Sequence, residues 1–230
     1  MASLCIWCKC FSENAPPEHV VPEAIGGPAD FVLTDGVVCE RCNNGLAHLD
    51  QAVCDEFDFM AFGAGVPRKG GKPPIIKSRG NFVGTHDSGK TAFSLNMDPA
   101  PVKAHDGSVL GAFGKSPRNI NASVRREGQN VHLSFQIPFG QTPKFARGIS
   151  KIALSSLAYF LGTDLALTQA FDPVREYVIH GSGHRAILMM APGDDTYKIE
   201  VQAPYIGKDG FYTVALRIGT LDFLVIFRLI

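Results

Sequence analysis

Two pairs of cysteines near the start of the chain have the residue type and the spacing of metal ligands. Each pair is a C-x-x-C motif, the first formed by Cys5 and Cys8 and the second by Cys39 and Cys42. Four thiolates complete a tetrahedral Zn²⁺ site, and binding the ion would stabilise a segment that has too few apolar residues to fold by itself. The motifs therefore predict a structural zinc ion held by these four residues.

Other interpretations of the cysteines are weaker. Four reduced, buried cysteines would need no metal, but the paired spacing favours zinc. A redox role requires a C-x-x-C at a strand-to-helix junction of the thioredoxin kind, which neither motif is predicted to occupy. Cys10 is the one further thiol able to compete for a ligand position, whereas Cys54 is expected to pack on the inner side of a helix.

The residues between and after the two pairs carry a second set of polar groups. The run Glu18-His19-Val20-Val21-Pro22 is followed by Gly26-Gly27, and Asn43 comes directly after Cys42. In this order the motifs resemble the HNH endonuclease family, in the subgroup with a four-cysteine structural zinc, over residues 5–55. The resemblance implies a ββα-metal module in which two short strands and a helix surround one divalent cation. It also implies an enzyme that hydrolyses phosphodiester bonds in DNA.

Carried over by position, the resemblance makes His19 the general base, and Glu18 and Asn43 the ligands of a catalytic Mg²⁺ or Mn²⁺. The chemistry of these side chains agrees. A neutral imidazole can take a proton from water near pH 7, and an oxygen-ligated divalent cation neutralises the scissile phosphate and the leaving oxygen. His19 as a core histidine, or as a side chain beside the zinc, is the structural alternative. His48, one turn into the helix, could lie near the metal but is interpreted as an exposed helical residue.

One position departs from the family pattern. The middle residue of the motif is usually Asn, and Thr34 stands there in this chain. Because the family residue mainly fixes the loop and orients the base, Thr34 is compatible with the module but favours a second interpretation. In that interpretation the segment is a non-catalytic zinc module that binds nucleic acid or a protein partner.

The charge of the chain is distributed unevenly although its formal net charge is zero. Residues 1–60 hold ten acidic and two basic residues, and the remainder holds twelve acidic and twenty basic residues. A surface that binds DNA must therefore come mainly from the second part, because the first repels phosphates except where a cation reverses the local field. The densest group of basic residues lies between residues 61 and 80 and comprises Arg68, Lys69, Lys72, Lys77 and Arg79.

Composition and hydropathy indicate a folded protein without a membrane helix. The chain is 45 % hydrophobic and 19 % charged, with no low-complexity segment. The N-terminus has no cationic start followed by an apolar core, so no signal peptide is predicted. The last apolar stretch, 214–230, is interrupted by charged residues and is too short to span a bilayer. We expect a cytoplasmic protein, with DNA as its partner and no membrane association.

The periodicity of apolar residues predicts the elements that position these groups. Apolar residues at three- and four-residue steps predict a helix over about 41–60. A Gly- and Pro-rich basic linker is expected over 61–80, followed by two hairpins near 82–95 and 120–137. Thr142 as N-cap, Pro143 and Gly162 as C-cap delimit the strongest predicted helix, on which Lys144, Arg147 and Lys151 share a face opposite the apolar stripe. That basic face would be solvated or contact phosphates.

Further helix interrupted at Pro173 and four C-terminal strands complete the prediction. The fold class is α+β: a small zinc-stabilised ββα-metal (HNH) module over 1–60, the linker over 61–80, and an α+β domain with antiparallel strands over 81–230. That last domain is expected to recognise DNA or a ligand such as a modified base. Residues 84–91 match the phosphate-binding pattern G-x-x-x-x-G-K-[ST], but the strand-like residues after them predict a hairpin tip instead.

Overall fold

The computed structural model describes residues 3–12, 15–67, 75–79, 82–87, 90–95, 121–128, 130–136, 139–183, 186–194, 196–207 and 210–228. The chain forms two compact units. Unit 1 combines residues 1–72 with 142–230, and unit 2 consists of residues 73–141. The cysteine motifs and the C-terminal strands therefore belong to the same compact unit.

The N-terminal part of unit 1 consists of two very short hairpins and one long helix. Strands β1 (Ser3–Leu4) and β2 (Phe11–Ser12) pair in antiparallel fashion, and so do β3 (Glu18–His19) and β4 (Val32–Leu33). The 3₁₀ turn η1 (Glu23–Ile25) lies between β3 and β4. Helix α1 (Glu40–Gly63) follows and confirms the helix predicted over 41–60. Its buried residues include Leu46, Leu49, Val53 and Phe57, which recur at helical spacing.

Helix α2 (Pro143–Leu161) has the predicted caps. Thr142 Oγ1 accepts a hydrogen bond from the Phe145 amide at 3.2 Å, Pro143 occupies the first turn, and Gly162 is the C-cap. Because the apolar stripe lies on one side of α2, we expected the opposite side of the helix to be exposed to solvent. Instead every residue from 148 to 158 is buried.

The remaining helical segments and the sheet complete unit 1. Helix α3 (Thr163–Leu167), the turn η3 (Gln169–Phe171) and helix α4 (Asp172–His180) follow α2. The interruption predicted at Pro173 lies at residues 168–171, and Pro173 is in the first turn of α4, where its fixed φ is compatible with the helix. The five-stranded antiparallel sheet comprises β10 (Ile187–Met190), β14 (Leu221–Arg228), β13 (Phe211–Gly219), β11 (Lys198–Val201) and the short β12 (Tyr205–Ile206).

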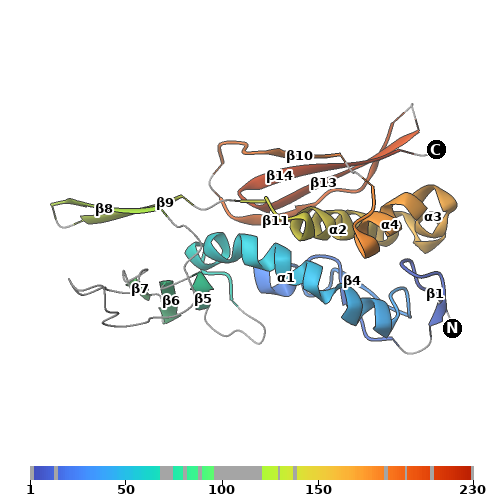
Figure 1. Ribbon diagram of the computed structural model, residues 1–230, viewed down its shortest axis with the longest axis horizontal. Coiled ribbons are helices and arrows are strands. Elements are labelled where there is room, and N and C mark those ends of the chain that lie inside the picture. Colours follow the sequence, from blue (N-terminus) through green and yellow to red (C-terminus); the bar gives the residue numbers. More distant parts are fainter. Residues whose placement is uncertain are drawn as a thin grey trace, which may run out of the picture. The chain divides into compact units, whose positions relative to one another are not determined.

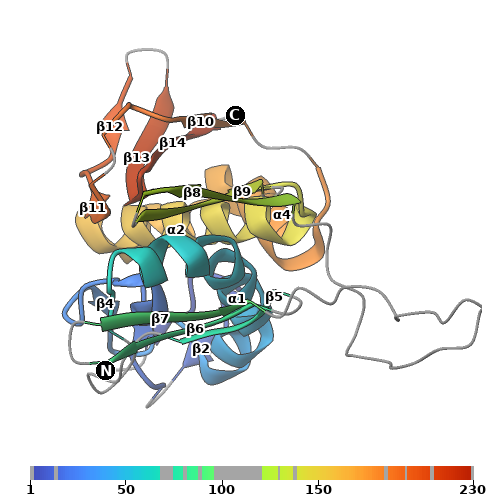
Figure 2. The same cartoon turned by 90° about the vertical axis from the view of Figure 1, so that its left-hand side faces the viewer.

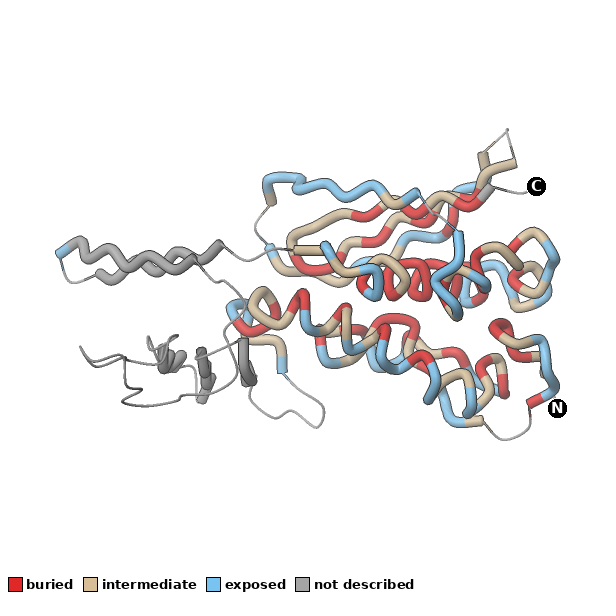
Figure 3. Tube along the Cα trace, in the orientation of Figure 1, coloured by how far each residue is buried: buried red, intermediate tan, exposed pale blue. Residues whose placement is uncertain are grey.

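Helix α2 occupies the centre of unit 1, between α1 and the sheet (Figure 1). Buried residues run through the middle of α2, from 148 to 158, and along alternate positions of β13 (Figure 3). Phe57 of α1, Phe145 of α2 and Phe223 of β14 contact one another with ring centroids 6.0 to 6.2 Å apart. A helix covered on both sides has no solvated face, which explains the burial of α2.

Unit 2 contains only antiparallel strands among its described residues. Strands β5 (Ile75–Arg79), β6 (Phe82–Asp87) and β7 (Lys90–Leu95) form one sheet, and β8 (Asn121–Glu127) pairs with β9 (Asn130–Gln136) (Figure 2). Both predicted hairpins are confirmed, and the phosphate-loop pattern at 84–91 runs from β6 into β7, so that a strand and not a helix continues from its last residue. Residues 75–79, which were assigned to the linker, form strand β5.

The α+β class with antiparallel strands is confirmed, but the structure divides the chain differently from the predicted ranges 1–60, 61–80 and 81–230. The division falls near residues 72 and 142, because the long helix α1 packs against α2, which belongs to the segment after residue 142. None of the described helices has the length and apolar content needed to cross a membrane.

Candidate metal centre and the adjoining Glu18–His19 site

The four predicted cysteines come together in unit 1. Cys5 and Cys8 lie in the turn that joins β1 to β2, which is closed by hydrogen bonds from the Cys5 amide to the Cys10 carbonyl and from the Lys9 amide to the Cys5 carbonyl. Cys39 is the N-cap of α1, and its sulfur accepts a hydrogen bond from the Cys42 amide at 3.4 Å. The Cys39 amide in turn donates to the Cys5 sulfur at 3.4 Å. A hairpin turn and a helix start thus present two thiols each.

The geometry of these thiols suits a tetrahedral metal. All four sulfur atoms lie within 4.8 Å of one another, and Cys8 Sγ and Cys39 Sγ are 3.7 Å apart. A tetrahedral Zn²⁺ with Zn–S distances of about 2.3 Å has S–S edges of about 3.8 Å, so the donor set and its spacing fit zinc. The predicted grouping of Cys5, Cys8, Cys39 and Cys42 is confirmed, while the identity of the ion stays a prediction.

The thiols ionise unequally in this cluster. Burial raises the pKa of Cys5 and of Cys42. For Cys8 burial has the same effect, but hydrogen bonds from the Cys10 backbone and the neighbouring thiols outweigh it and lower the pKa to about 6. Four thiolates this close repel one another, and a divalent cation removes that opposition.

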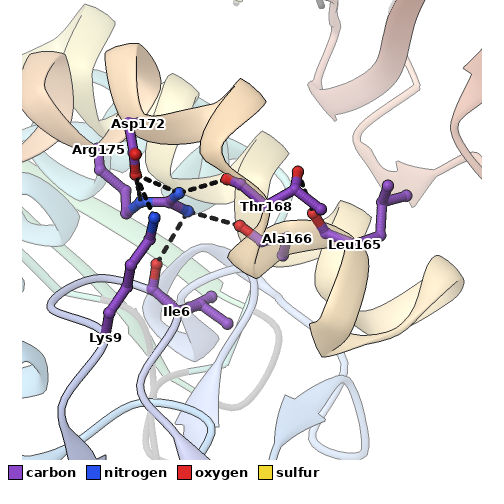
Figure 4. A network of polar contacts seen from close by, with 7 residues as sticks. All are labelled: Ile6, Lys9, Leu165, Ala166, Thr168, Asp172 and Arg175. Atoms are coloured by element: carbon purple, nitrogen blue, oxygen red, sulfur yellow. Dashed lines mark hydrogen bonds and ion pairs between the residues drawn. The ribbon is translucent and has the colours of Figure 1, made fainter.

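The first cysteine turn is attached to the helices at the end of α2. The Arg175 guanidinium of α4 donates hydrogen bonds to the carbonyl oxygens of Ile6, Ala166 and Thr168 (Figure 4). It also pairs with Asp172, which Lys9 contacts at 2.6 Å. Because Ile6 and Lys9 belong to the cysteine turn, the C-terminal helices help to hold the metal centre in place.

The loop between β3 and β4 depends on its two glycines. Gly26 has φ of 88°. A side chain at Gly27 would place its Cβ 2.2 Å from the Val21 carbonyl oxygen. The amides of both glycines close the turn, by hydrogen bonds to the carbonyls of Glu23 and Pro22. The Gly-Gly of the sequence motif therefore has a steric cause, which is to return the chain from β3 to β4.

His19 lies on β3 with one-third of its side chain exposed. Its Nε2 is 4.0 Å from the carboxylate of Glu23, which lies four residues further along the chain. Thr34, directly after β4, donates a hydrogen bond to Asp35 Oδ2 at 2.8 Å, within the turn that leads to Cys39. Asn43 is half-buried in the first turn of α1. His48 is exposed, as predicted, and its ring contacts the Gly45 carbonyl at 2.9 Å.

Glu18, predicted as a metal ligand, is held by a buried lysine that the sequence analysis assigned to a basic face. Lys151 Nζ contacts Glu18 Oε1 and lies 2.7 Å from both carboxylate oxygens of Asp50. The exposed side-chain fractions are 2 % for Lys151, 7 % for Glu18 and 25 % for Asp50. Burial raises the pKa of Glu18 against the opposing effect of Lys151. Burial would lower the pKa of Lys151, but Asp50 and Glu18 together raise it.

The prediction that Lys144, Arg147 and Lys151 form a solvent-facing basic face of α2 is therefore wrong for two of these three residues. Only Lys144 is exposed. Arg147 donates hydrogen bonds to the carbonyls of Val178 and Ile179 at 2.7 to 3.0 Å, and Lys151 is neutralised by two carboxylates. Both cations face neighbouring elements because α2 is enclosed. The only sequence signal for Lys151 is that its neighbours Ile149, Ile152 and Ala153 are apolar.

Five basic residues were predicted to contact DNA. Of these, Arg68, Lys69 and Lys72 lie outside the described residues, and Lys77 and Arg79 belong to strand β5 of unit 2.

Comparisons of the chain with models of known protein families, with curated proteins and with solved structures find no match.

Proposed function

We propose that this protein is a metal-dependent DNA endonuclease of the HNH type, with His19 as general base and Glu18 and Asn43 as ligands of Mg²⁺ or Mn²⁺. The observation that carries the proposal is the succession β3, β4, α1 beside a four-cysteine cluster. Glu18 and His19 lie on the first strand of that succession, and Asn43 follows the last cysteine at the start of the helix. A bound divalent cation would neutralise charge on the scissile phosphate and the leaving oxygen.

In this proposal the residues of the chain would have the following roles. His19, partly exposed, would accept the proton of the attacking water, and the Glu23 carboxylate lies 4.0 Å from its Nε2. Thr34 would keep the turn before Cys39 in place, as its hydrogen bond to Asp35 does. The cysteine cluster with bound zinc would fix the start of α1. The basic residues Arg68, Lys69, Lys72, Lys77 and Arg79 would supply phosphate contacts.

The test is cleavage of supercoiled plasmid DNA in Mg²⁺ or Mn²⁺, with EDTA as the blank. His19→Ala should reduce the cleavage rate by about a hundredfold or more, because the base that takes the proton is removed. His48→Ala is the matched control, since His48 is exposed on α1 and should leave the rate unchanged. Equal rates for wild type and His19→Ala would place the active site elsewhere.

A non-catalytic zinc module that binds nucleic acid or a protein partner is the second candidate. The ion pair of Glu18 with Lys151 favours it, because a carboxylate that is already neutralised is a weaker cation ligand. Absence of cleavage with any divalent ion, together with retained DNA binding, would support this candidate over the nuclease.

A further inference from the structure

The ion-paired group of Glu18, Asp50 and Lys151 joins three elements that are far apart in sequence. Glu18 comes from β3, Asp50 from α1 and Lys151 from α2. The Lys151 ammonium has three N–H donors, and three carboxylate oxygens surround it: Glu18 Oε1 and both oxygens of Asp50. Each donor thus has an acceptor, so the ammonium is fixed in place although it is 2 % exposed.

The two carboxylates are used differently by the lysine. Asp50 offers both oxygens, whereas Glu18 offers only Oε1. Among the described residues no donor hydrogen-bonds to Glu18 Oε2. Lys151 therefore fixes the orientation of the Glu18 carboxylate through one oxygen, and the other oxygen is the one that a cation bound to Glu18 would use.

This inference rests on the proposed role of Glu18 as a cation ligand. We propose that Lys151 is a positioning residue for Glu18, and that the charge of Lys151 also limits how tightly the site binds a divalent cation. Asp50 sets the strength of this effect because it neutralises Lys151. Two carboxylates and one ammonium leave a net charge of about −1. A divalent cation on Glu18 is then attracted weakly enough to exchange, while the carboxylate stays in one orientation.

The proposal makes predictions of opposite sign for the two partners of Glu18. Lys151→Met removes a positive charge next to Glu18 and should tighten Mn²⁺ binding by about tenfold, the effect of one unit charge about 6 Å from a divalent ion even at the dielectric constant of water. Asp50→Asn removes a negative charge and should weaken Mn²⁺ binding by a similar factor. If the ion pair were purely structural, both variants would change the melting temperature, but they would not shift the Mn²⁺ affinity in opposite directions.

The experiment is calorimetric or EPR titration of Mn²⁺ into the full-length, zinc-loaded protein without DNA. Glu18→Gln is the reference and should abolish the binding. Arg147→Met is the matched control, because it removes a cation from the same helix that contacts carbonyls and no carboxylate. It should leave the Mn²⁺ affinity unchanged. Lys151→Arg keeps the charge and should bind Mn²⁺ with near wild-type affinity.

The outcomes separate this inference from the proposed function. Equal Mn²⁺ affinity in wild type, Lys151→Met and Asp50→Asn would overturn the inference even if the protein cuts DNA. Absence of Mn²⁺ binding to wild type and to Lys151→Met would overturn it as well. Shifts of opposite sign would support it even if no DNA is cut, in which case the nuclease proposal alone fails. If Lys151→Met does not fold, Lys151→Gln, which also removes the positive charge, should tighten Mn²⁺ binding in its place.

Discussion

At the scale of single residues, the six cysteines differ in how far a reagent can reach them. Cys10 is exposed and lies outside the cluster of four, and Cys54 is a thiol of α1 whose pKa burial raises to about 12. With zinc bound to the other four, we expect Cys10 to be the one thiol per chain that a reagent reaches, and its labelling to be lost in Cys10→Ser. Because the hydrogen bond to Cys8 raises the pKa of Cys10, its labelling should become faster as the pH rises above 8.

The measurement is mass-resolved alkylation combined with elemental analysis. About one Zn²⁺ per chain should accompany the single labelled site, and a strong chelator should make the cluster thiols reactive. Labelling of four further cysteines in untreated protein, with no zinc found, would contradict the zinc assignment.

What the sequence could predict at this scale depended on how local each interaction is. Cys5, Cys8, Cys39 and Cys42 are recognisable because a knuckle needs only four consecutive residues and the ligand type is rare. Lys151 is not, because its partners Glu18 and Asp50 lie 133 and 101 residues away. A lysine that continues a basic spacing on a helix is normally solvated, and only the enclosure of α2 makes this one buried.

At the scale of elements, the contact between α1 and α2 depends on a glycine. A Cβ at Gly148 of α2 would lie 2.5 Å from Val53 Cγ2 and 2.8 Å from the Leu49 carbonyl oxygen, both of α1. Gly148→Ala should destabilise the protein by about 1–3 kcal/mol, since overpacking outweighs the gain in helix propensity. Denaturant unfolding gives the value.

Gly45 of α1 is the control for that substitution. A Cβ there would meet nothing within 4 Å. Gly45→Ala should therefore stabilise the protein by up to about 1 kcal/mol through helix propensity alone. Equal stabilisation by both substitutions would show that α1 and α2 are not in close contact at Gly148.

Elements specified by local signals were the ones predicted best. The bounds of α2 follow from Thr142, Pro143 and Gly162, whose effects need no distant partner. Strand β5 was missed because its residues follow a Gly- and Pro-rich stretch that is typical of a linker, and its pairing partner β6 supplies the hydrogen bonds. The burial of both sides of α2 was missed because a hydrophobic stripe reports one packing surface, not two.

At the scale of the whole molecule, the N-terminal segment depends on the C-terminal one. The zinc motifs and the family resemblance indicated a separate module over 1–60, but several contacts join the segments within unit 1. Among them are the Lys151 ion pairs, the hydrogen bond from Arg175 to the Ile6 carbonyl at 3.4 Å and the hydrogen bond from Tyr197 to the Ile25 carbonyl at 2.7 Å. Buried polar contacts of this kind are costly to leave without partners, so each segment should need the other.

A split chain tests this dependence directly. Residues 1–72 and 142–230, co-expressed as separate polypeptides with a tag on one of them, should co-purify as a 1:1 complex that contains about one Zn²⁺, because α1 and α2 bury their apolar surfaces against each other. Lys151→Glu in the second polypeptide should abolish co-purification, since it places a third carboxylate against Glu18 and Asp50, whereas Lys144→Glu, at an exposed position of α2, should not. If instead 1–72 alone is a folded, zinc-containing monomer that does not capture 142–230, the two segments are independent domains, as the zinc motifs and the family resemblance predicted.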